Sequence, residues 1–439
     1  MTKHPASHRG HHLLTAGKRF STGGVLALAA APLARRLLDR IDQGLERGSI
    51  SVRLPGGSKR LLGRRTAGPE AVVILNSWRA LARLATGGSV GWFRAWMEGE
   101  WDSPDPVALF ELFVVNRDTL GGAGRASGAG RLVNRLLHGL RNNSHGRARR
   151  NIGFHYDLGN DFYQAWLDET QTYSSALFAE PVSSAEPLEA AQTRKVRALL
   201  DRLNLKPGDR LLEIGCGWGY LAEVAARDYG VHVHGITLSQ EQLAFARERI
   251  SRAGLADRVA LSLTDYRDLT GQYDAVTSVE MVEAVGEEYW PAFLKAVTQA
   301  LKPGGRAALQ LISIDDAIYE SYARNADFIQ TYIFPGGMLI SEERFSAIAA
   351  GQGLLWHDRR GLAPHYVETL KRWRARFDAA VAEGRFPTGF DERFHRLWRY
   401  YLMYCEGGFR GGGIDVVQVT LVKGRGLSGV RWCVQALGA

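Results

Sequence analysis

Hydrophobic and polar positions follow two different periods along the chain after residue 151, and these periods predict its secondary structure. Short apolar runs, typical of buried strands, alternate with segments in which apolar residues recur every three or four positions, as on one face of a helix. Helices are expected at 240–253 and 289–301, and strands at 211–214, 231–236, 259–263, 275–279, 307–312 and 416–422. Alternating strands and helices predict an α/β domain with an open parallel sheet, closed by the last of these strands.

The amino-terminal part has a mixed pattern. Helical and strand-like segments follow one another irregularly, at 25–50, 50–54, 71–75, 78–84 and 107–116. We therefore expect a small α+β domain over residues 30–118, separate from the α/β domain over 151–425. Residues 319–337 and 345–405 carry many aromatic residues at helical spacing, which predicts a helical cover on the larger domain.

Three segments lie outside these domains. Residues 1–29 are expected to form a disordered or amphipathic terminus, whose histidines fit a solvated tail better than a metal site. Residues 119–150 predict a flexible Gly-rich linker that continues into a basic amphipathic helix with leucines on one face, and 426–439 form a tail. The arginines of this basic run are Arg131, Arg135, Arg141, Arg147, Arg149 and Arg150.

Composition and charge narrow the class of protein. The 439 residues suffice for two domains, and no stretch approaches the roughly 20 apolar residues that a membrane-spanning helix needs. Three cysteines without a C-x-x-C spacing predict neither disulfides nor a zinc site and fit a cytoplasmic protein. The net charge of +9 predicts an anionic partner. The leucines of the basic run favour the inner face of a membrane over nucleic acid, although a merely solvated linker remains an alternative.

A glycine-rich turn at 211–219 carries the strongest chemical signal. The run ends in Glu213 and is followed by alternating glycines, Gly215, Gly217 and Gly219, before a helical pattern begins. Such a turn lets a ligand approach the backbone and the start of the helix. A dinucleotide fingerprint would place its third glycine one residue later and an acidic residue after the second strand. The pattern therefore favours S-adenosylmethionine (SAM), whose amino and sulfonium groups are cationic, over NAD.

Further polar residues follow the other expected strands. In parallel sheets, ligands bind at the carboxyl ends of the strands, so these side chains are expected to converge around one ligand. They are Thr237, Asp265, Tyr266, Glu280, Glu283 and Gln310.

Several motifs in order resemble the cyclopropane-fatty-acyl-phospholipid synthase family. The similarity spans roughly residues 150–423 and is looser in the amino-terminal domain. The motifs are Phe154-His-Tyr-Asp-Leu-Gly-Asn160, Thr172-Tyr-Ser-Ser175, Leu212-Glu-Ile-Gly-Cys-Gly-Trp-Gly219, Gly235-Ile-Thr-Leu-Ser239 with Gln242, Asp265-Tyr-Arg-Asp268, Glu280-Met-Val-Glu-Ala-Val-Gly286 and Tyr332-Ile-Phe-Pro-Gly-Gly337.

The resemblance implies a class I SAM-methyltransferase fold and methyl transfer from SAM to a cis double bond of an unsaturated phospholipid. It implies cofactor contacts at the methionine end for Tyr173, Ser174 and Gly215, besides Glu213 and Gly217 of the turn. It further implies that Thr237, Leu238 and Gln242 contact the ribose and that Asp265 and Tyr266 lie near the adenine. A homodimer is compatible with the sequence.

The expected chemistry begins with attack of the alkene on the sulfonium methyl, which leaves a cation on the acyl chain. Aromatic faces stabilise such a cation, and Tyr173, Tyr332, Phe334 and Tyr366 are candidates. The resemblance implies a bound bicarbonate as the base, held around Glu283 and Tyr366, and it places Ser175, Gln310 and Ile312 in the same catalytic set. Ser175 and Gln310 depart from the cysteine and histidine common in the family.

A serine hydroxyl and an amide can still donate to an oxyanion, so the sequence favours a cyclopropane product. The alternative is a hydride shift that ends in a methylene- or methyl-branched chain. Two other classes of function remain: a SAM enzyme acting on a small soluble or nucleic-acid substrate, and an inactive lipid-binding protein. The absence of an Asn-Pro-Pro-Tyr-type motif disfavours base methylation, and the intact Glu213, Glu283 and glycines disfavour an inactive protein.

Overall fold

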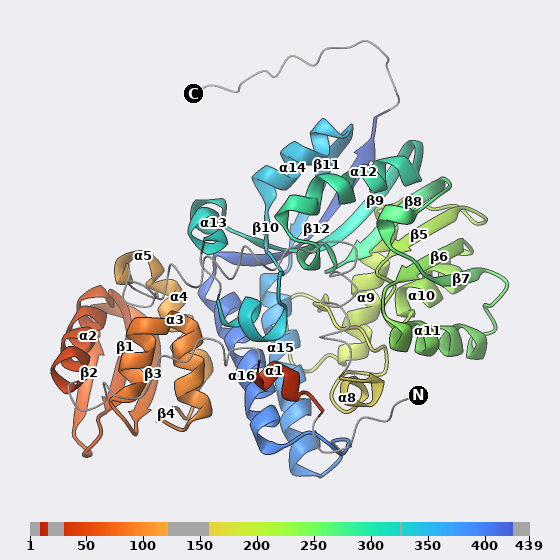
Figure 1. Cartoon of the computed structure of the whole chain (residues 1–439). Coiled ribbons are helices and arrows are strands. Elements are labelled where there is room, and N and C mark those ends of the chain that lie inside the picture. The colour runs from red at the N-terminus through yellow and green to blue at the C-terminus, as the bar shows by residue number, and fades with distance from the viewer. Residues whose placement is uncertain (1–8, 16–29, 122–157, 325–326, 425–439) are drawn as a thin grey trace, which may run out of the picture.

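The computed structural model describes residues 9–15, 30–121, 158–324 and 327–424. A small unit formed by residues 30–121 lies beside a larger α/β unit, and the long helices α15 (Ala363–Ala382) and α16 (Glu392–Gly411) lie between the small unit and the large sheet (Figure 1).

The large sheet confirms the predicted α/β class and has the strand order β11-β12-β9-β8-β5-β6-β7. Its parallel strands are β5 (Arg210–Ile214), β6 (His232–Thr237), β7 (Val259–Leu263), β8 (Tyr273–Val279) and β9 (Leu301–Ile314). The sheet is mixed rather than wholly parallel, because β12 (Ile414–Lys423) runs antiparallel to β9. The last strand therefore does not close the sheet. The edge beyond it is β11 (Leu354–Gly361), whose mostly exposed, charged residues gave no strand signal.

Helices cover both faces of this sheet because neighbouring strand residues point to opposite sides. Leu211 packs with α9 (Leu188–Asp201), α10 (Tyr220–Tyr229) and α11 (Gln240–Arg252). The next residue, Leu212, packs with α12 (Trp290–Ala300) and α14 (Glu342–Gly351). The short elements α8 (Asn160–Gln164), η3 (Tyr266–Asp268), η4 (Val282–Ala284), η5 (Glu287–Tyr289), α13 (Asp316–Ala323), η6 (Ile329–Ile333) and β10 (Ile340–Ser341) complete the unit.

The small unit is α+β, as the sequence predicts. Its sheet has the order β2-β1-β3-β4, with β1 and β3 parallel. The strands are β1 (Arg47–Arg53), β2 (Lys59–Gly63), β3 (Thr66–Leu75) and β4 (Trp101–Asp102), and the helices are α2 (Ala30–Gly44), α3 (Arg79–Met97), α4 (Pro106–Val115) and α5 (Arg117–Leu120).

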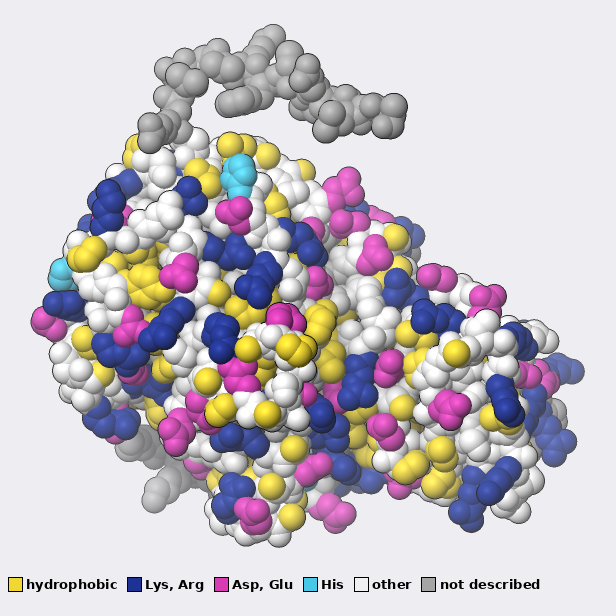
Figure 2. Space-filling model, turned by 180° about the vertical axis from the view of Figure 1, so that it is seen from behind, with side chains coloured by type: hydrophobic (Ala, Val, Ile, Leu, Met, Phe, Trp, Pro, Cys, Tyr) yellow, Lys and Arg dark blue, Asp and Glu magenta, His cyan; other side chains and the backbone are white. Residues whose placement is uncertain are grey.

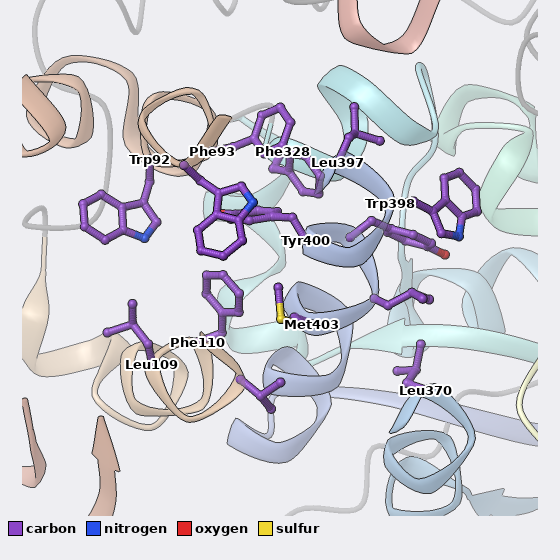
Figure 3. Close-up of a cluster of buried hydrophobic side chains, with 14 of the residues drawn as sticks. Trp92, Phe93, Leu109, Phe110, Phe328, Leu370, Leu397, Trp398, Tyr400 and Met403 are labelled. Atoms are coloured by element: carbon purple, nitrogen blue, oxygen red, sulfur yellow. The ribbon is translucent and has the colours of Figure 1, made fainter. Parts of the chain in front are cut away.

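The two units share one continuous core. Aromatic residues of α3 and α4 meet Phe328 and Tyr400 of the larger unit, as Figure 3 shows. Two glycines of α16 let α4 approach closely. A Cβ on Gly407 would lie 2.5 Å from Cβ of Phe110, and one on Gly411 would lie 2.4 Å from Cβ of Val114. The two expected domains are thus not separate in space, because they pack closely against each other through α4 and α16.

Part of the expected disordered terminus has a defined place. Residues His11–Thr15 form α1, and Leu13 of this helix is fully buried. Arg9 anchors the segment through an ion pair with Asp161 at 2.5 Å and lies over the ring of Phe390. The arginines expected to bind a membrane, and the tail 426–439, lie outside the described residues. Among the described helices, none is long and apolar enough to cross a membrane.

Candidate active site

A continuous cavity of about 580 Å³ extends from the carboxyl ends of the parallel strands to the small unit. At one end it is lined by Gly215 and Gly217 of the glycine turn. At the other end it reaches Leu84 and Trp92 of α3 and Phe110 of α4. One wall is formed by aromatic residues of α16, so the predicted helical cover also contributes to the cavity.

The glycine turn forms a cradle that side chains would obstruct. Gly215, Gly217 and Gly219 all have positive φ, of 86°, 50° and 83°. A Cβ on Gly217 would meet nothing within 4 Å, so this glycine faces open space in the cavity. A Cβ on Gly219 would instead lie 2.9 Å from Cβ of Ala246, so this glycine allows α10 and α11 to pack. The turn thus serves both ligand access and helix packing.

The side chains expected at the ribose and adenine line the same end of the cavity. Thr237 donates a hydrogen bond to Oε1 of Gln242 at 3.1 Å, which leaves the Gln242 amide group to face a ligand, and Leu238 is adjacent. Asp265 is held by Arg267 at 2.6 Å. Burial raises the pKa of the neighbouring Tyr266 to about 12, so its hydroxyl stays a hydrogen-bond donor.

These residues fit SAM. The cradle at Gly217 leaves room for a ligand against the backbone, and the amide, hydroxyl and carboxylate groups beyond it suit ribose and adenine. When bound, SAM supplies the electrophilic methyl group. Tyr173 lines this part of the cavity, and its hydroxyl lies 2.7 Å from that of Tyr401.

Glu213 and Ser174 lie behind the cavity wall rather than on it. Both are buried, and Oε2 of Glu213 has no hydrogen-bond partner among the described residues. Burial raises the pKa of Glu213 to about 8. The fully buried Lys195 donates to Oγ of Ser174 at 2.6 Å, and burial lowers its pKa to about 8. Lys195 could not be recognised from the sequence, because a lysine in an amphipathic helix normally indicates a solvated position.

Glu283 is the carboxyl group that the sequence places in the expected catalytic set. It lines the cavity, and its Oε1 accepts a hydrogen bond from the backbone N–H of Ile312. Its Oε2 has no partner among the described residues. Burial, followed by the neighbouring charge of Glu280, raises the pKa of Glu283 to about 8. The carboxyl is therefore mostly protonated near neutral pH.

Ser175 and Gln310 are brought together, but around a carboxylate rather than an open anion site. Neither lines the cavity. Oε1 of Glu280 accepts from the backbone N–H of Ser175 and from Nε2 of Gln310, each at 2.8 Å. Gln418 fixes the Gln310 amide by donating to its Oε1 at 3.0 Å. The Ser175 hydroxyl points away and donates to the carbonyl of Ala176.

These residues do not fit a bound bicarbonate. The donors at Ser175 and Gln310 are engaged by Glu280, and the N–H of Ile312 is engaged by Glu283. An additional anion would lie beside two carboxyl groups in a buried site. The sequence places Glu280 among the strand-end residues without giving it a role. A second negative charge beside a bound bicarbonate is unfavourable, and this could have indicated the misfit.

The aromatic residues expected to stabilise a cation divide into two groups. Tyr173, Phe334 and Tyr366 line the cavity. Tyr332 is not among the lining residues. It packs against Phe93, and its hydroxyl accepts from Nε of Arg94 at 3.1 Å. Tyr401 of α16, which belongs to the expected helical cover, also lines the cavity.

Comparison with known proteins places this site in a family. The family model described as mycolic acid cyclopropane synthetase matches residues 143–419. The chain is 39% identical over 416 residues to the tuberculostearic acid methyltransferase of Mycobacterium tuberculosis, covering 91% of this chain and 93% of that one. It is 38% identical over 273 residues to the cyclopropane-fatty-acyl-phospholipid synthase of Escherichia coli, covering 62% and 67%.

A solved structure shares the fold of the larger unit. The mycolic acid cyclopropane synthase complexed with SAH and CTAB aligns with a TM-score of 0.59 and 32% identity, over 63% of this chain and 98% of that one. The order of the strands, the glycine cradle and these matches all indicate the same family. The chain therefore belongs to the mycolic acid cyclopropane synthetase family and is a SAM-dependent methyltransferase of the lipid-modifying class.

Proposed function

We propose that this enzyme transfers the methyl group of SAM to the cis double bond of an unsaturated acyl chain carried by a phospholipid. The observation that carries the proposal is the continuity of the cavity, which joins the glycine cradle to an apolar and aromatic space reaching α3 and α4. An acyl chain lying in that space would bring its double bond beside the cofactor site. A small polar substrate would leave most of this apolar surface without a partner.

The reaction requires stabilisation of positive charge and then removal of a proton. The π electrons of the double bond form the new carbon–carbon bond to the methyl group as the sulfur–methyl bond breaks. The other alkene carbon becomes cationic, and the faces of Tyr173, Phe334 and Tyr366 are the nearest electron-rich surfaces in the cavity. A base then takes a proton, and the product depends on when it does so.

We favour a methylene-branched product over the cyclopropane that the sequence favours. In this route a hydride shifts between the two former alkene carbons, and the new methyl then loses a proton to give a carbon–carbon double bond. Support comes from the relative matched across both units, whose name indicates methyl branching. The cyclopropane remains the second candidate, favoured by the family model and by the relative from Escherichia coli.

The lipid is proposed to be taken from an anionic membrane surface on the cytoplasmic side. Support comes from the net charge of +9 and from the outer end of the small unit, where Figure 2 shows several Lys and Arg side chains. Arg53, Lys59, Arg64 and Arg65 are exposed and lie on or directly after β1 and β2, the strand pair that also carries Leu61, which is 51% exposed. A basic surface with an exposed apolar side chain suits anionic headgroups.

Lipid analysis tests the proposal. The protein is expressed in a bacterial host without such an activity, and the acyl chains are compared with those from cells expressing Gly217→Asp. We expect new chains heavier by one CH2 unit with the wild type alone. Proton NMR then separates the products, because the =CH2 protons of a methylene branch resonate apart from the CH=CH protons of unreacted chains, and ring methylene protons lie far upfield. Ring signals alone would select the cyclopropane, and unchanged chains would contradict lipid methylation.

A further inference from the structure

Two carboxyl groups, Glu280 and Glu283, line the cavity, and their surroundings differ. Oε1 of Glu280 receives hydrogen bonds from a backbone N–H and a fixed amide, and the Tyr366 hydroxyl also hydrogen-bonds to this side chain. Glu283 receives one backbone N–H and has an oxygen without a partner among the described residues. Burial raises the pKa of both groups, but hydrogen bonds to the charged form favour ionisation. Glu280, with more donors, is therefore the better held carboxylate, and Glu283 the carboxylic acid.

The backbone holds Glu280 in this position at a conformational cost. Its φ is +46°, a left-handed conformation that side chains other than glycine rarely adopt. The conformation is fixed by a hydrogen bond from its N–H to the carbonyl of Gln310 at 2.7 Å. Gln310 therefore binds both the backbone and the side chain of Glu280. This double attachment directs the carboxylate to the donors at position 175 and at Gln310.

A buried cation balances the carboxylate. The charge of Lys195 on α9 favours the ionised form of Glu280 and opposes the rise in its pKa that burial causes. Lys195 is fully buried and hydrogen-bonded to Ser174, next in sequence to the residue whose N–H binds Glu280. The site is thus built for one resident negative charge, and a second anion would be repelled.

We propose that the Glu280 carboxylate is the catalytic base of this enzyme and takes the place of a bound bicarbonate. The proposal rests on the proposed methyl transfer to an acyl chain. The carboxylate takes a proton from the transferred methyl group, and the electrons of that C–H bond form the new carbon–carbon bond of the product. Glu280 is left as a carboxylic acid, and its proton passes to water when the product leaves. Glu283, already protonated, keeps a second negative charge out of the cavity.

The substitution Glu280→Gln keeps the size of the side chain and removes the base. Loss of a general base lowers turnover by about 10²–10⁴-fold, so we expect a fall on the order of 10³-fold. Turnover is measured as SAH release from vesicles of unsaturated phosphatidylglycerol, and SAH affinity is measured by calorimetry. The affinity is expected to stay within about twofold, because the effect lies in the transition state. The matched control is Glu288→Gln on the same loop, where the side chain is exposed.

The substitution Glu280→Gly tests the replacement of bicarbonate directly. Glycine accepts a φ of +46° without strain, so the variant relaxes the backbone while vacating the carboxylate position. Calorimetric titration with sodium bicarbonate is expected to show saturable binding to this variant and none to the wild type. Added bicarbonate is expected to restore part of the turnover of Glu280→Gly, whereas wild-type turnover is unchanged in CO2-free buffer.

Three results would overturn the proposal. These are near-wild-type turnover of Glu280→Gln, saturable bicarbonate binding by the wild type, and failure of bicarbonate to bind to Glu280→Gly that still binds SAH. The binding measurements need no lipid substrate. If the wild type methylates no unsaturated lipid, the proposed function fails, while the bicarbonate titrations still decide what occupies the anion position.

Discussion

The two ends of the cavity are built from different kinds of sequence. The cofactor end comes mainly from residues 214–217, 236–242 and 264–267, which follow three strands that neighbour one another in the sheet. The other end, which we call the acyl end because the proposed acyl chain would lie there, comes from residues 84–121 and 312–414, which belong to both units. Backbone geometry shapes the first end, whereas the packing of distant helices shapes the second.

This difference separates the effects of substitutions. A change in the glycine cradle alters the space for SAM without touching the interface between the units. A change between α4 and α16 alters the acyl end and leaves the strand ends in place. The two ends are therefore expected to fail independently, and the following experiments test this independence, in order of decreasing effect.

Gly217→Asp is expected to abolish SAM binding. Its side chain would enter the open space of the cradle and leave a carboxylate where the ligand belongs, so the loss of affinity should exceed about 100-fold. Calorimetry measures the affinity. The matched control is Gly208→Asp, since Gly208 also has positive φ and no atom within 4 Å of a Cβ. Equal SAM affinity of Gly217→Asp and the wild type would refute the assignment of the glycine cradle as the SAM-binding site.

Replacing Arg147, Arg149 and Arg150 together with Gln should weaken binding to anionic vesicles while sparing SAM affinity. Each arginine near such a surface contributes about 1 kcal/mol, so the triple variant should bind about 100-fold more weakly at low salt. Vesicle flotation at two salt concentrations measures this. Unchanged flotation would mean that this segment only tethers the two units.

Gly407→Leu should damage the acyl end selectively. Even a Cβ would clash with Phe110 of α4, and overpacking costs about 1–3 kcal/mol. We expect turnover with lipid to fall about tenfold, since a tenfold change corresponds to about 1.4 kcal/mol, with SAM affinity unchanged. Gly351→Leu at the exposed end of α14 is the control, because no atom lies within 4 Å of its Cβ. Parallel loss of SAM affinity would show that the two ends are coupled.

Glu283→Gln should change the dependence of stability on pH. The pKa of Glu283 is raised in the folded protein to about 8. The wild type therefore loses stability as the pH rises from the unfolded pKa near 4.5 through the folded value. Residue 283 does not titrate in the glutamine variant. The Tm of the variant minus the Tm of the wild type should therefore increase by a few degrees from about pH 5 to about pH 8. A Tm difference that is independent of pH would contradict the assigned burial of Glu283.

Strand and helix positions at the cofactor end could be predicted because they depend on nearby residues. The apolar run before Glu213 and the three glycines after it indicate a strand and a turn, followed directly by a helix. The structure has β5 up to Ile214 and α10 from Tyr220. The edge strand β11 could not be predicted in this way. Its side chains are mostly exposed and charged, and only pairing with β12 makes it a strand.

The sequence by itself determined the strand periods, the glycine turn and the residue types at the strand ends. Tertiary structure alone decided which of these groups meet. Ser175 and Glu280 are 105 positions apart, and Ser175 and Gln310 are 135 apart, yet they form one hydrogen-bonded cluster. Local backbone preferences act between neighbours in sequence, whereas a buried carboxylate is satisfied by whatever donors the packed fold brings to it. That is why the glycine cradle could be predicted and the carboxylate in the expected anion site could not.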